Sequence, residues 1–288
     1  MVSPLSILKS TFGLTEFRTP QIEVITHILN GDDALVLMPT GGGKSLCYQL
    51  PALLLPGITI VISPLIALME DQVQAAKQLG ISAGYLNSTQ SSSDRAAIMA
   101  SAREGTLKLL YLAPERLQSE DCQSFLAELE IALVAIDEAH CVSQWGHNFR
   151  PDYLLLSLFK ERYPRVPLIA LTATANELTR TEIVEKLQIP QGKVFIKGFD
   201  RPNIYYQLQH KKEPRRQLLN FLKTRHGQAG IVYCLSRKKT EQTAAWLNSQ
   251  RFEALAYHAG MNSEERASNQ HRFLHEDGVI VVLSLIHI

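Results

Sequence analysis

A glycine-rich loop at residues 38–45 follows directly on a short apolar run at residues 34–38, and this junction constrains the fold more than any other feature. An apolar run without alternation is typical of a strand buried on both faces of a parallel sheet. Three adjacent glycines, Gly41, Gly42 and Gly43, allow the backbone N–H groups to converge on an anion, and a following helix would add its positive N-terminal end. The junction therefore predicts a strand, a phosphate-binding loop and a helix.

The two residues after the glycines carry the chemistry of this loop. Lys44 is expected to reach the β- and γ-phosphates of a nucleotide, and the Ser45 hydroxyl to ligate Mg²⁺. The strict pattern G-x-x-x-x-G-K-[ST] is not met, because Met38 stands where the first glycine belongs. Alone, the loop is also compatible with an ordinary turn that carries a solvated lysine.

Composition bounds the remaining possibilities. With 288 residues, 45% of them hydrophobic, the chain is long enough for about two domains. Its net charge of +1 means that any contact with a polyanion must come from local basic patches. The most apolar region, residues 53–69, is interrupted by prolines and a glycine, and no basic and apolar leader precedes it. We therefore expect a cytoplasmic protein without membrane spans.

The cysteines exclude two common kinds of small-domain scaffold. They are far apart and none belongs to a C-x-x-C pair, which argues against a disulfide framework and against zinc. They are typical of thiols in a reducing cytosol. The four positions are Cys47, Cys122, Cys141 and Cys234.

Short apolar runs alternate with amphipathic stretches along the first two thirds of the chain. This alternation predicts an α/β fold, a parallel sheet with helices on both faces, whose ligand lies at the carboxyl ends of the strands. Further strands are expected at residues 58–63, 109–112, 133–136 and 168–171. Helices are expected within residues 5–30, as a pair, and at residues 65–79, 93–103, 153–163 and 177–187.

The alternation breaks at residues 199–203 and then restarts, which predicts a domain boundary near residue 201. The first domain would span residues 1–200. The second, residues 201–288, has about 88 residues and is short for a lobe of the same kind. Its strands are expected at residues 204–208, 229–234, 255–257 and 279–283, and its helices at residues 215–224, 237–249 and 263–274.

Two further pairs of polar residues suggest a nucleotide site. Arg18 and Gln21 are expected on the second N-terminal helix. They suit the recognition of adenine, because an amide matches the N6/N7 edge of the base and an arginine can stack on its ring. The alternative is that both are solvated side chains. Asp137 and Glu138 end an apolar strand, where Asp137 would hold Mg²⁺ and Glu138 would polarise the attacking water. A solvated helix start is the alternative for this pair, and the upstream Lys44 favours the catalytic interpretation.

These motifs together resemble the superfamily 2 helicases, and specifically RecQ-type DNA helicases, along almost the whole chain. The resemblance implies two RecA-like lobes, ATP and Mg²⁺ as cofactors, and 3′–5′ unwinding of DNA, both single-stranded and duplex, in recombination and repair. It also implies a location in the bacterial cytosol or nucleoid. Residues 17–21 resemble the adenine-reading motif, residues 38–45 the phosphate loop, residues 63–69 and 112–117 the DNA-side motifs, and residues 170–175 the motif that links hydrolysis to movement.

Residues 141–151 resemble the aromatic-rich loop that separates RecQ from its relatives. Trp145 and Phe149 offer flat faces for unstacked bases, and Arg150 offers phosphate or cation–π contacts; packing of the two aromatics in a core is the alternative. The resemblance assigns coupling and DNA binding to His140, Gln144, Trp145, Phe149 and Arg150. The loop has Asn148 where the family usually has Asp, and Leu14 stands where the family tends to have an aromatic that stacks on adenine.

In the second domain, residues 231–237 and 256–261 resemble second-lobe motifs. Ser236 and Arg237 would contact DNA phosphate at a helix N-terminus, or else form a solvated helix start. The family's next two motifs, the last with an arginine finger, are not found, and residues 283–288 do not resemble it. We therefore expect a truncated chain whose first lobe is complete and whose second is incomplete.

An arginine finger is worth about 10³–10⁵ in rate, so hydrolysis by this chain is expected to be slow. Two alternatives to an active DNA helicase stay open. One is an ATP-gated nucleic-acid-binding fragment without catalysis. The other is a superfamily 2 RNA helicase, against which the aromatic loop argues.

Overall fold

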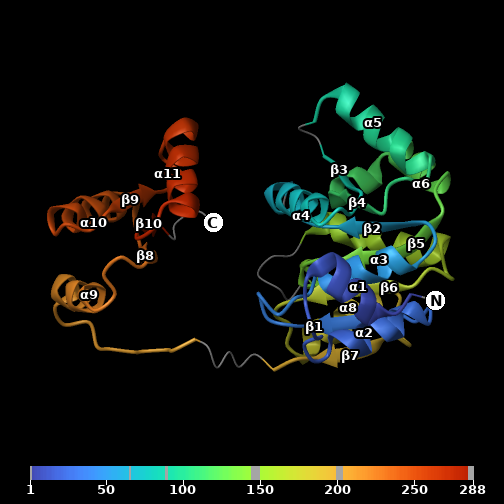
Figure 1. The fold of residues 1–288 in the computed structure, drawn as a ribbon, viewed down its shortest axis with the longest axis horizontal. Coiled ribbons are helices and arrows are strands. Elements are labelled where there is room, and N and C mark those ends of the chain that lie inside the picture. Colours follow the sequence, from blue (N-terminus) through green and yellow to red (C-terminus); the bar gives the residue numbers. More distant parts are fainter. Residues whose placement is uncertain (1, 65, 88–89, 144–149, 199–203, 285–288) are drawn as a thin grey trace. The chain divides into compact units, whose positions relative to one another are not determined.

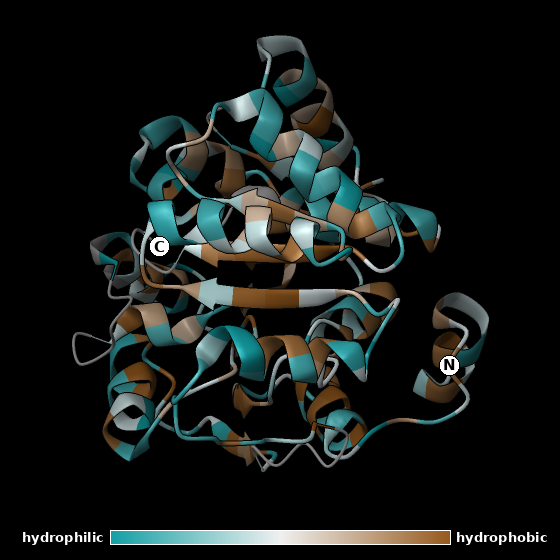
Figure 2. Cartoon of the chain, turned by 90° about the vertical axis from the view of Figure 1, so that its left-hand side faces the viewer, coloured by the Kyte–Doolittle hydropathy of each residue, from teal (hydrophilic) through white to brown (hydrophobic). Residues whose placement is uncertain are grey.

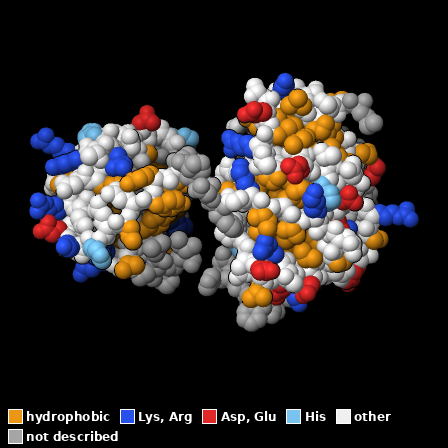
Figure 3. All heavy atoms as spheres, turned by 90° about the horizontal axis from the view of Figure 1, so that it is seen from below, with side chains coloured by type: hydrophobic (Ala, Val, Ile, Leu, Met, Phe, Trp, Pro, Cys, Tyr) orange, Lys and Arg blue, Asp and Glu red, His pale blue; other side chains and the backbone are white. Residues whose placement is uncertain are grey.

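The computed structural model describes the chain apart from residues 1, 65, 88–89, 144–149, 199–203 and 285–288 (Figure 1). The chain divides into two compact units, Met1–Asn203 and Ile204–Ile288. Within the described residues no helix is both long enough and apolar enough to span a membrane. On the face of unit 1 in view in Figure 3, basic and acidic side chains are interspersed, in keeping with the small net charge.

Unit 1 is built on a parallel sheet in the order β3-β4-β2-β5-β6-β1-β7. Most strands that are neighbours in the sheet are not consecutive in the sequence, so crossover connections join them. The strands are β1 Ala34–Leu37, β2 Ile58–Ile62, β3 Ala83–Leu86, β4 Leu109–Leu112, β5 Ile131–Ile136, β6 Leu168–Thr172 and β7 Lys193–Ile196. The α/β fold and the parallel sheet predicted from the alternation are confirmed.

Helices cover both faces of this sheet. Successive residues of a strand therefore pack into two different hydrophobic clusters, one on each face. Leu35 and Leu37 face one hydrophobic cluster, and Ala34 and Val36 face the other. In Figure 2 the strands are predominantly hydrophobic, whereas the helices alternate hydrophobic and hydrophilic residues. The helices are α1 Pro4–Phe12, α2 Gln21–Leu29, α3 Leu46–Leu54, α4 Ile66–Gln78, α5 Ser92–Arg103, α6 Glu120–Ala127, α7 Ser157–Arg162 and α8 Glu177–Lys186.

Three details of unit 1 differ from the sequence-based expectation. The short edge strands β3 and β7 were not predicted; β3 contains Gly84, and β7 exposes three of its four residues. The helix predicted at residues 153–163 is confirmed only in its second half, by α7, and is wrong for residues 153–156. A 3₁₀ helix, η3 Pro151–Leu156, precedes α7 instead, and its three residues per turn align the fully buried side chains of Tyr153 and Leu156.

Unit 2 has a smaller parallel sheet in the order β8-β10-β9, which makes it a partial second lobe. The strand predicted at residues 204–208 is wrong. This segment pairs with none of the described strands, and Tyr205 and Leu208 are 82% and 99% exposed. The elements are α9 Pro214–Lys223, β8 Gly230–Cys234, α10 Arg237–Ser249, β9 Ala254–Tyr257, α11 Ser263–His275 and β10 Ile280–Ser284.

Candidate functional site

The glycine loop connects strand β1, which lies between β6 and β7 in the sheet, to helix α3, as the sequence predicts. Its entry is fixed to the neighbouring strand, since the Met38 N–H donates to the Thr172 carbonyl at 3.1 Å. Gly43 has a φ of 83°, and a Cβ there would lie 2.3 Å from Nε2 of Gln21. A Cβ on Gly42 would lie 2.8 Å from the Pro39 carbonyl oxygen. The loop therefore curls too tightly for side chains at these positions.

Arg18 and Gln21 both donate hydrogen bonds to backbone carbonyls of this loop. Nη1 of Arg18 donates to the Gly41 carbonyl at 3.1 Å, and Nε2 of Gln21 donates to the Gly43 carbonyl at 3.1 Å. The amide oxygen of Gln21 accepts from the Arg18 N–H at 2.8 Å, so both ends of this buried amide are engaged within the chain.

One expectation about this pair is wrong. Arg18 lies ahead of α2 rather than on it, because the helix begins only at Gln21, after Pro20. A residue that precedes proline is disfavoured in the helical conformation, which keeps Thr19 out of the helix. The recognition of adenine by Arg18 and Gln21 stays a prediction.

Lys44 links the loop to the carboxylates after β5. Its Nζ donates to the Met38 carbonyl at 3.2 Å, across the mouth of the loop. Its positive charge is also within electrostatic reach of the Asp137 and Glu138 carboxyls. Ser45 follows at the start of α3. The sheet thus brings together residues that lie about a hundred positions apart in the sequence.

The two carboxylates lie in different environments. The Asp137 N–H donates to the Ile62 carbonyl at 2.8 Å, and its Oδ1 accepts from the Glu138 N–H at 3.0 Å. Burial, followed by the charge of Glu138, raises the pKa of Asp137 to about 6. Glu138 has a φ of 48°, a left-handed conformation that is costly for a non-glycine residue.

His140 joins Glu138 to the end of strand β6. Its Nδ1 lies 3.2 Å from Oε2 of Glu138 and 3.0 Å from Oγ1 of Thr172. Hydrogen bonds to Cys141 and Glu138 raise the pKa of His140 to about 9, and the bond to His140 lowers the pKa of Glu138. The imidazolium therefore holds Glu138 as a carboxylate and ties it to Thr172.

Of the aromatic-rich loop, Gln144, Trp145 and Phe149 lie outside the described residues, as does Asn148. Arg150 is described and is half-buried. Its Nη1 donates to the Pro64 carbonyl at 2.8 Å and lies 3.9 Å from Oε1 of Glu115. Arg150 thus connects the segment after β5 with the segments that follow β2 and β4.

Three buried tyrosines near Asp137 are not among the site residues predicted from the sequence. The Tyr153 hydroxyl donates to the Asp137 carbonyl at 3.1 Å. The hydroxyls of Tyr48 and Tyr111 lie 3.2 Å apart. A tyrosine within a buried strand or helix face is the signal that could have found them, because its hydroxyl requires a partner there.

In unit 2, Ser236 and Arg237 begin α10. The Ser236 hydroxyl accepts from the Lys239 N–H at 3.3 Å, so it caps the helix. The Arg237 side chain packs beside Gly260, whose N–H donates to Nδ1 of the buried His258 at 3.2 Å. The two motifs that the sequence singles out in this unit therefore lie side by side.

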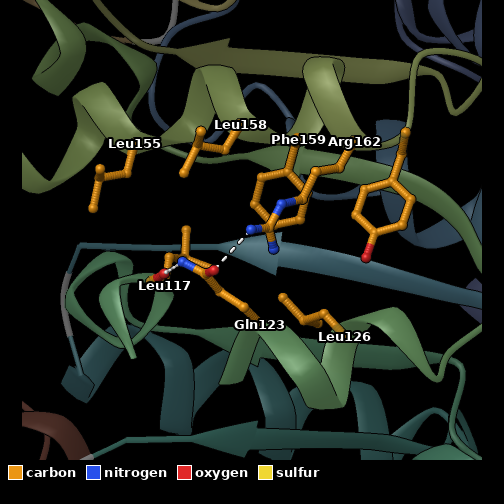
Figure 4. Close-up of a pocket in the computed structure, with 8 residues that line it drawn as sticks. Leu117, Gln123, Leu126, Leu155, Leu158, Phe159 and Arg162 are labelled. Carbon is orange, nitrogen blue, oxygen red and sulfur yellow. Dashed lines mark hydrogen bonds between the residues drawn. The ribbon is translucent and has the colours of Figure 1, made fainter. Parts of the chain in front are cut away.

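A small pocket of unit 1 lies apart from this arrangement, between η1 Pro114–Gln118, α6, η3 and α7. Its volume is only about 20 Å³, room for a single water molecule. Arg162 closes one side by donating to Oε1 of Gln123 at 2.8 Å (Figure 4). The remaining lining is largely apolar and comes from Leu117, Leu126, Leu155, Leu158, Phe159 and Tyr163.

A family model described as DEAD/DEAH box helicase matches residues 18–181. The ATP-dependent DNA helicase RecQ of Pasteurella multocida is 45% identical over 281 residues, which cover 98% of this chain and 44% of the relative. RecQ of Haemophilus influenzae is also 45% identical, over 98% of this chain and 45% of its own length. The chain thus spans less than half the length of these relatives.

Solved structures agree on the fold. A DUF1998 helicase, MrfA, bound to DNA and AMPPNP, superposes with a TM-score of 0.73 over 98% of this chain and 43% of its own, at 18% identity. The helicase Lhr of Mycobacterium smegmatis, bound to single-stranded DNA and AMP-PNP, gives a TM-score of 0.66 over 98% and 41% of the two chains, also at 18% identity.

Proposed function

The chain belongs to the DEAD/DEAH box helicases, and among them to the RecQ type, and from this premise we propose that it couples ATP hydrolysis to 3′–5′ unwinding of duplex DNA in recombination and repair. The family implies ATP binding. The observation that carries the proposal is that Lys44, at the end of the curled loop, lies within electrostatic reach of Asp137 and Glu138 after β5. Unit 1 would be the ATP-binding lobe, and unit 2 part of the second lobe.

The residues present fit MgATP. Backbone N–H groups of Thr40, Gly41 and Gly43 would hold the phosphates, joined by that of Gly42 once it exchanges the Pro39 carbonyl, to which it donates at 2.9 Å, for a phosphate oxygen. Lys44 would likewise exchange the Met38 carbonyl for a phosphate oxygen. The Ser45 hydroxyl and the Asp137 carboxylate are the oxygen donors that suit Mg²⁺, whose other ligands would be phosphate oxygens and water. When bound, Mg²⁺ neutralises charge on the phosphates.

Glu138 would act as the base in hydrolysis. Its hydrogen bond with His140 lowers its pKa, so it is a carboxylate at neutral pH. It would orient a water and take its proton while the water oxygen bonds to the γ-phosphorus and the bond to the β-phosphate oxygen breaks, which yields ADP and phosphate. Arg18 and Gln21 would recognise adenine.

DNA would be held by both units. Gln144, Trp145, Phe149 and Arg150 would contact a single strand in unit 1, and Ser236 and Arg237 its phosphates in unit 2. His140 supports the coupling of the two activities, because it contacts both Glu138 and Thr172. The names of the RecQ relatives support DNA as the nucleic acid.

The test is ATP hydrolysis by the 288-residue chain, alone, with single-stranded DNA and with RNA, beside a Lys44→Ala variant. DNA-stimulated turnover that the variant lacks supports the proposal. Stimulation by RNA alone would favour an RNA helicase instead. Binding of ATP and DNA without any turnover would leave an ATP-gated binding protein and would contradict the proposal that this chain hydrolyses ATP.

A further inference from the structure

Arg237, which the proposed function assigns to a DNA phosphate, lies in the first turn of α10 and is exposed. Among the described residues, none forms a hydrogen bond or an ion pair with its guanidinium. Glu241 lies four residues further along α10, the spacing at which an arginine and a carboxylate on one helix can pair. The structure gives Glu241 a different partner.

That partner is His258, which follows strand β9. Its Nε2 lies 3.0 Å from Oε1 of Glu241, and its Nδ1 lies 3.2 Å from the backbone nitrogen of Gly260. A backbone N–H can only donate, so Nδ1 is the acceptor, and Nε2 carries the hydrogen that is donated to Glu241. Both nitrogens of this imidazole are thus satisfied, as its burial requires.

The two hydrogen bonds tie the turn after β9 to helix α10, which packs on that strand (Figure 1). Arg237 lies against this turn. A Cβ built on Gly260 would be 3.1 Å from Nη1 and 3.2 Å from Cδ of Arg237. The arginine side chain therefore runs across Gly260, where a hydrogen atom leaves room for it and a methyl group would not.

Support of the fold alone does not explain this arrangement. The Glu241 side chain is 62% exposed, so its contact with His258 contributes little stability. Gly260 is exposed and lies outside the left-handed region, so its backbone would accept other residues, and alanine there would reduce the entropy of the unfolded chain. What distinguishes glycine at this position is the room that it leaves for Arg237.

We propose that Glu241, His258 and Gly260 are positioning residues that hold the Arg237 guanidinium open for a DNA phosphate. The inference rests on the proposed DNA contact of Arg237. His258 engages the carboxylate that could otherwise pair with the arginine, and it fixes the turn against which the arginine side chain extends. An arginine that is oriented in advance loses less side-chain freedom when it binds a phosphate, so it binds more tightly.

The experiment measures binding of a fluorescein-labelled single-stranded oligonucleotide by fluorescence anisotropy at several KCl concentrations, with an unfolding curve for each variant of the 288-residue chain. Arg237→Ala should weaken binding about three- to tenfold. It should also reduce the slope of log affinity against log salt by roughly 0.7, the value for one phosphate contact on a single strand.

Gly260→Ala should reduce this slope by a similar amount, because its Cβ displaces the guanidinium. Gly230→Ala is the matched control in the same unit, since its added Cβ would meet only Cγ1 of Ile280, at 3.8 Å. The control should keep the affinity and the slope of the wild type.

Two further comparisons separate positioning from a general loss of structure. The double variant of Arg237→Ala and Gly260→Ala should bind no more weakly than Arg237→Ala alone, because both substitutions remove the same contact. Glu241→Gln should bind about threefold more tightly than Glu241→Ala, since both lose the same charge but only glutamine keeps an oxygen that can accept from His258.

Three results would overturn the inference alone: additive losses in the double variant, equal binding by the two Glu241 variants, or a Gly260→Ala variant that matches Gly230→Ala. An Arg237→Ala variant with the affinity and salt slope of the wild type would overturn the inference together with the proposed phosphate contact.

Discussion

His140 offers the sharpest test of the electrostatics at the end of β5. Its contacts with Cys141 and Glu138 raise its pKa from 6.5 to about 9. Between these two pH values the folded state binds a proton that the unfolded state releases, so the free energy of unfolding falls as the pH rises. The stabilisation is fully present below pH 6.5 and is lost as the pH passes through 9. A shift of this size corresponds to roughly 3 kcal/mol, because each pKa unit is worth about 1.4 kcal/mol.

The perturbation is His140→Gln, which keeps a polar side chain of similar reach but cannot carry the charge. We expect the variant to be less stable than the wild type by about 3 kcal/mol at pH 6 and nearly equal to it at pH 10. Urea unfolding of both proteins, at intervals from pH 6 to 10, measures this difference. A constant difference across the whole range would refute the argument, because it would mean that the contacts of His140 do not depend on its charge.

Three further predictions concern side chains and glycines of unit 1. Gly43→Ala should abolish nucleotide binding. The control Gly105→Ala, also at positive φ but with open space around its Cβ, should lower the free energy of unfolding by only about 1 kcal/mol and leave binding intact. Equal effects of the two variants on nucleotide binding and on unfolding would contradict the steric argument. Lys160→Met should destabilise unit 1 by about 2 kcal/mol in urea unfolding. The partly buried Asp33, whose Oδ1 accepts from Lys160 Nζ at 2.9 Å, would lose this charged partner and keep only the Leu168 N–H at 2.8 Å; a change below experimental error would disprove this. Tyr153→Phe should cost about 1 kcal/mol by the same assay, through loss of the bond to the Asp137 carbonyl, and an unchanged midpoint would show that this bond contributes no net stability.

Features that depend on neighbours in the sequence were predictable. The buried strand before the loop, the tight glycine turn and the helix after it follow from residue types within a dozen positions, and so does the strand that ends at Asp137. Errors arose where a local pattern needs a distant partner. The alternating segment at residues 204–208 has no adjacent strand among the described residues, and Arg18 lies outside α2 because Pro20 delays the helix start.

The sequence by itself determined the fold class, the loop and the chemical identity of its lysine and carboxylates, since each is encoded in a short run of residues. Only the tertiary structure decided which side chains meet. The order of strands β2, β5, β6 and β1 brings His140 to Thr172, and packing of α3 on the sheet brings Tyr48 to Tyr111, 63 residues away. No periodicity along the chain records such contacts, because they depend on how crossovers arrange the strands and on which faces the helices cover.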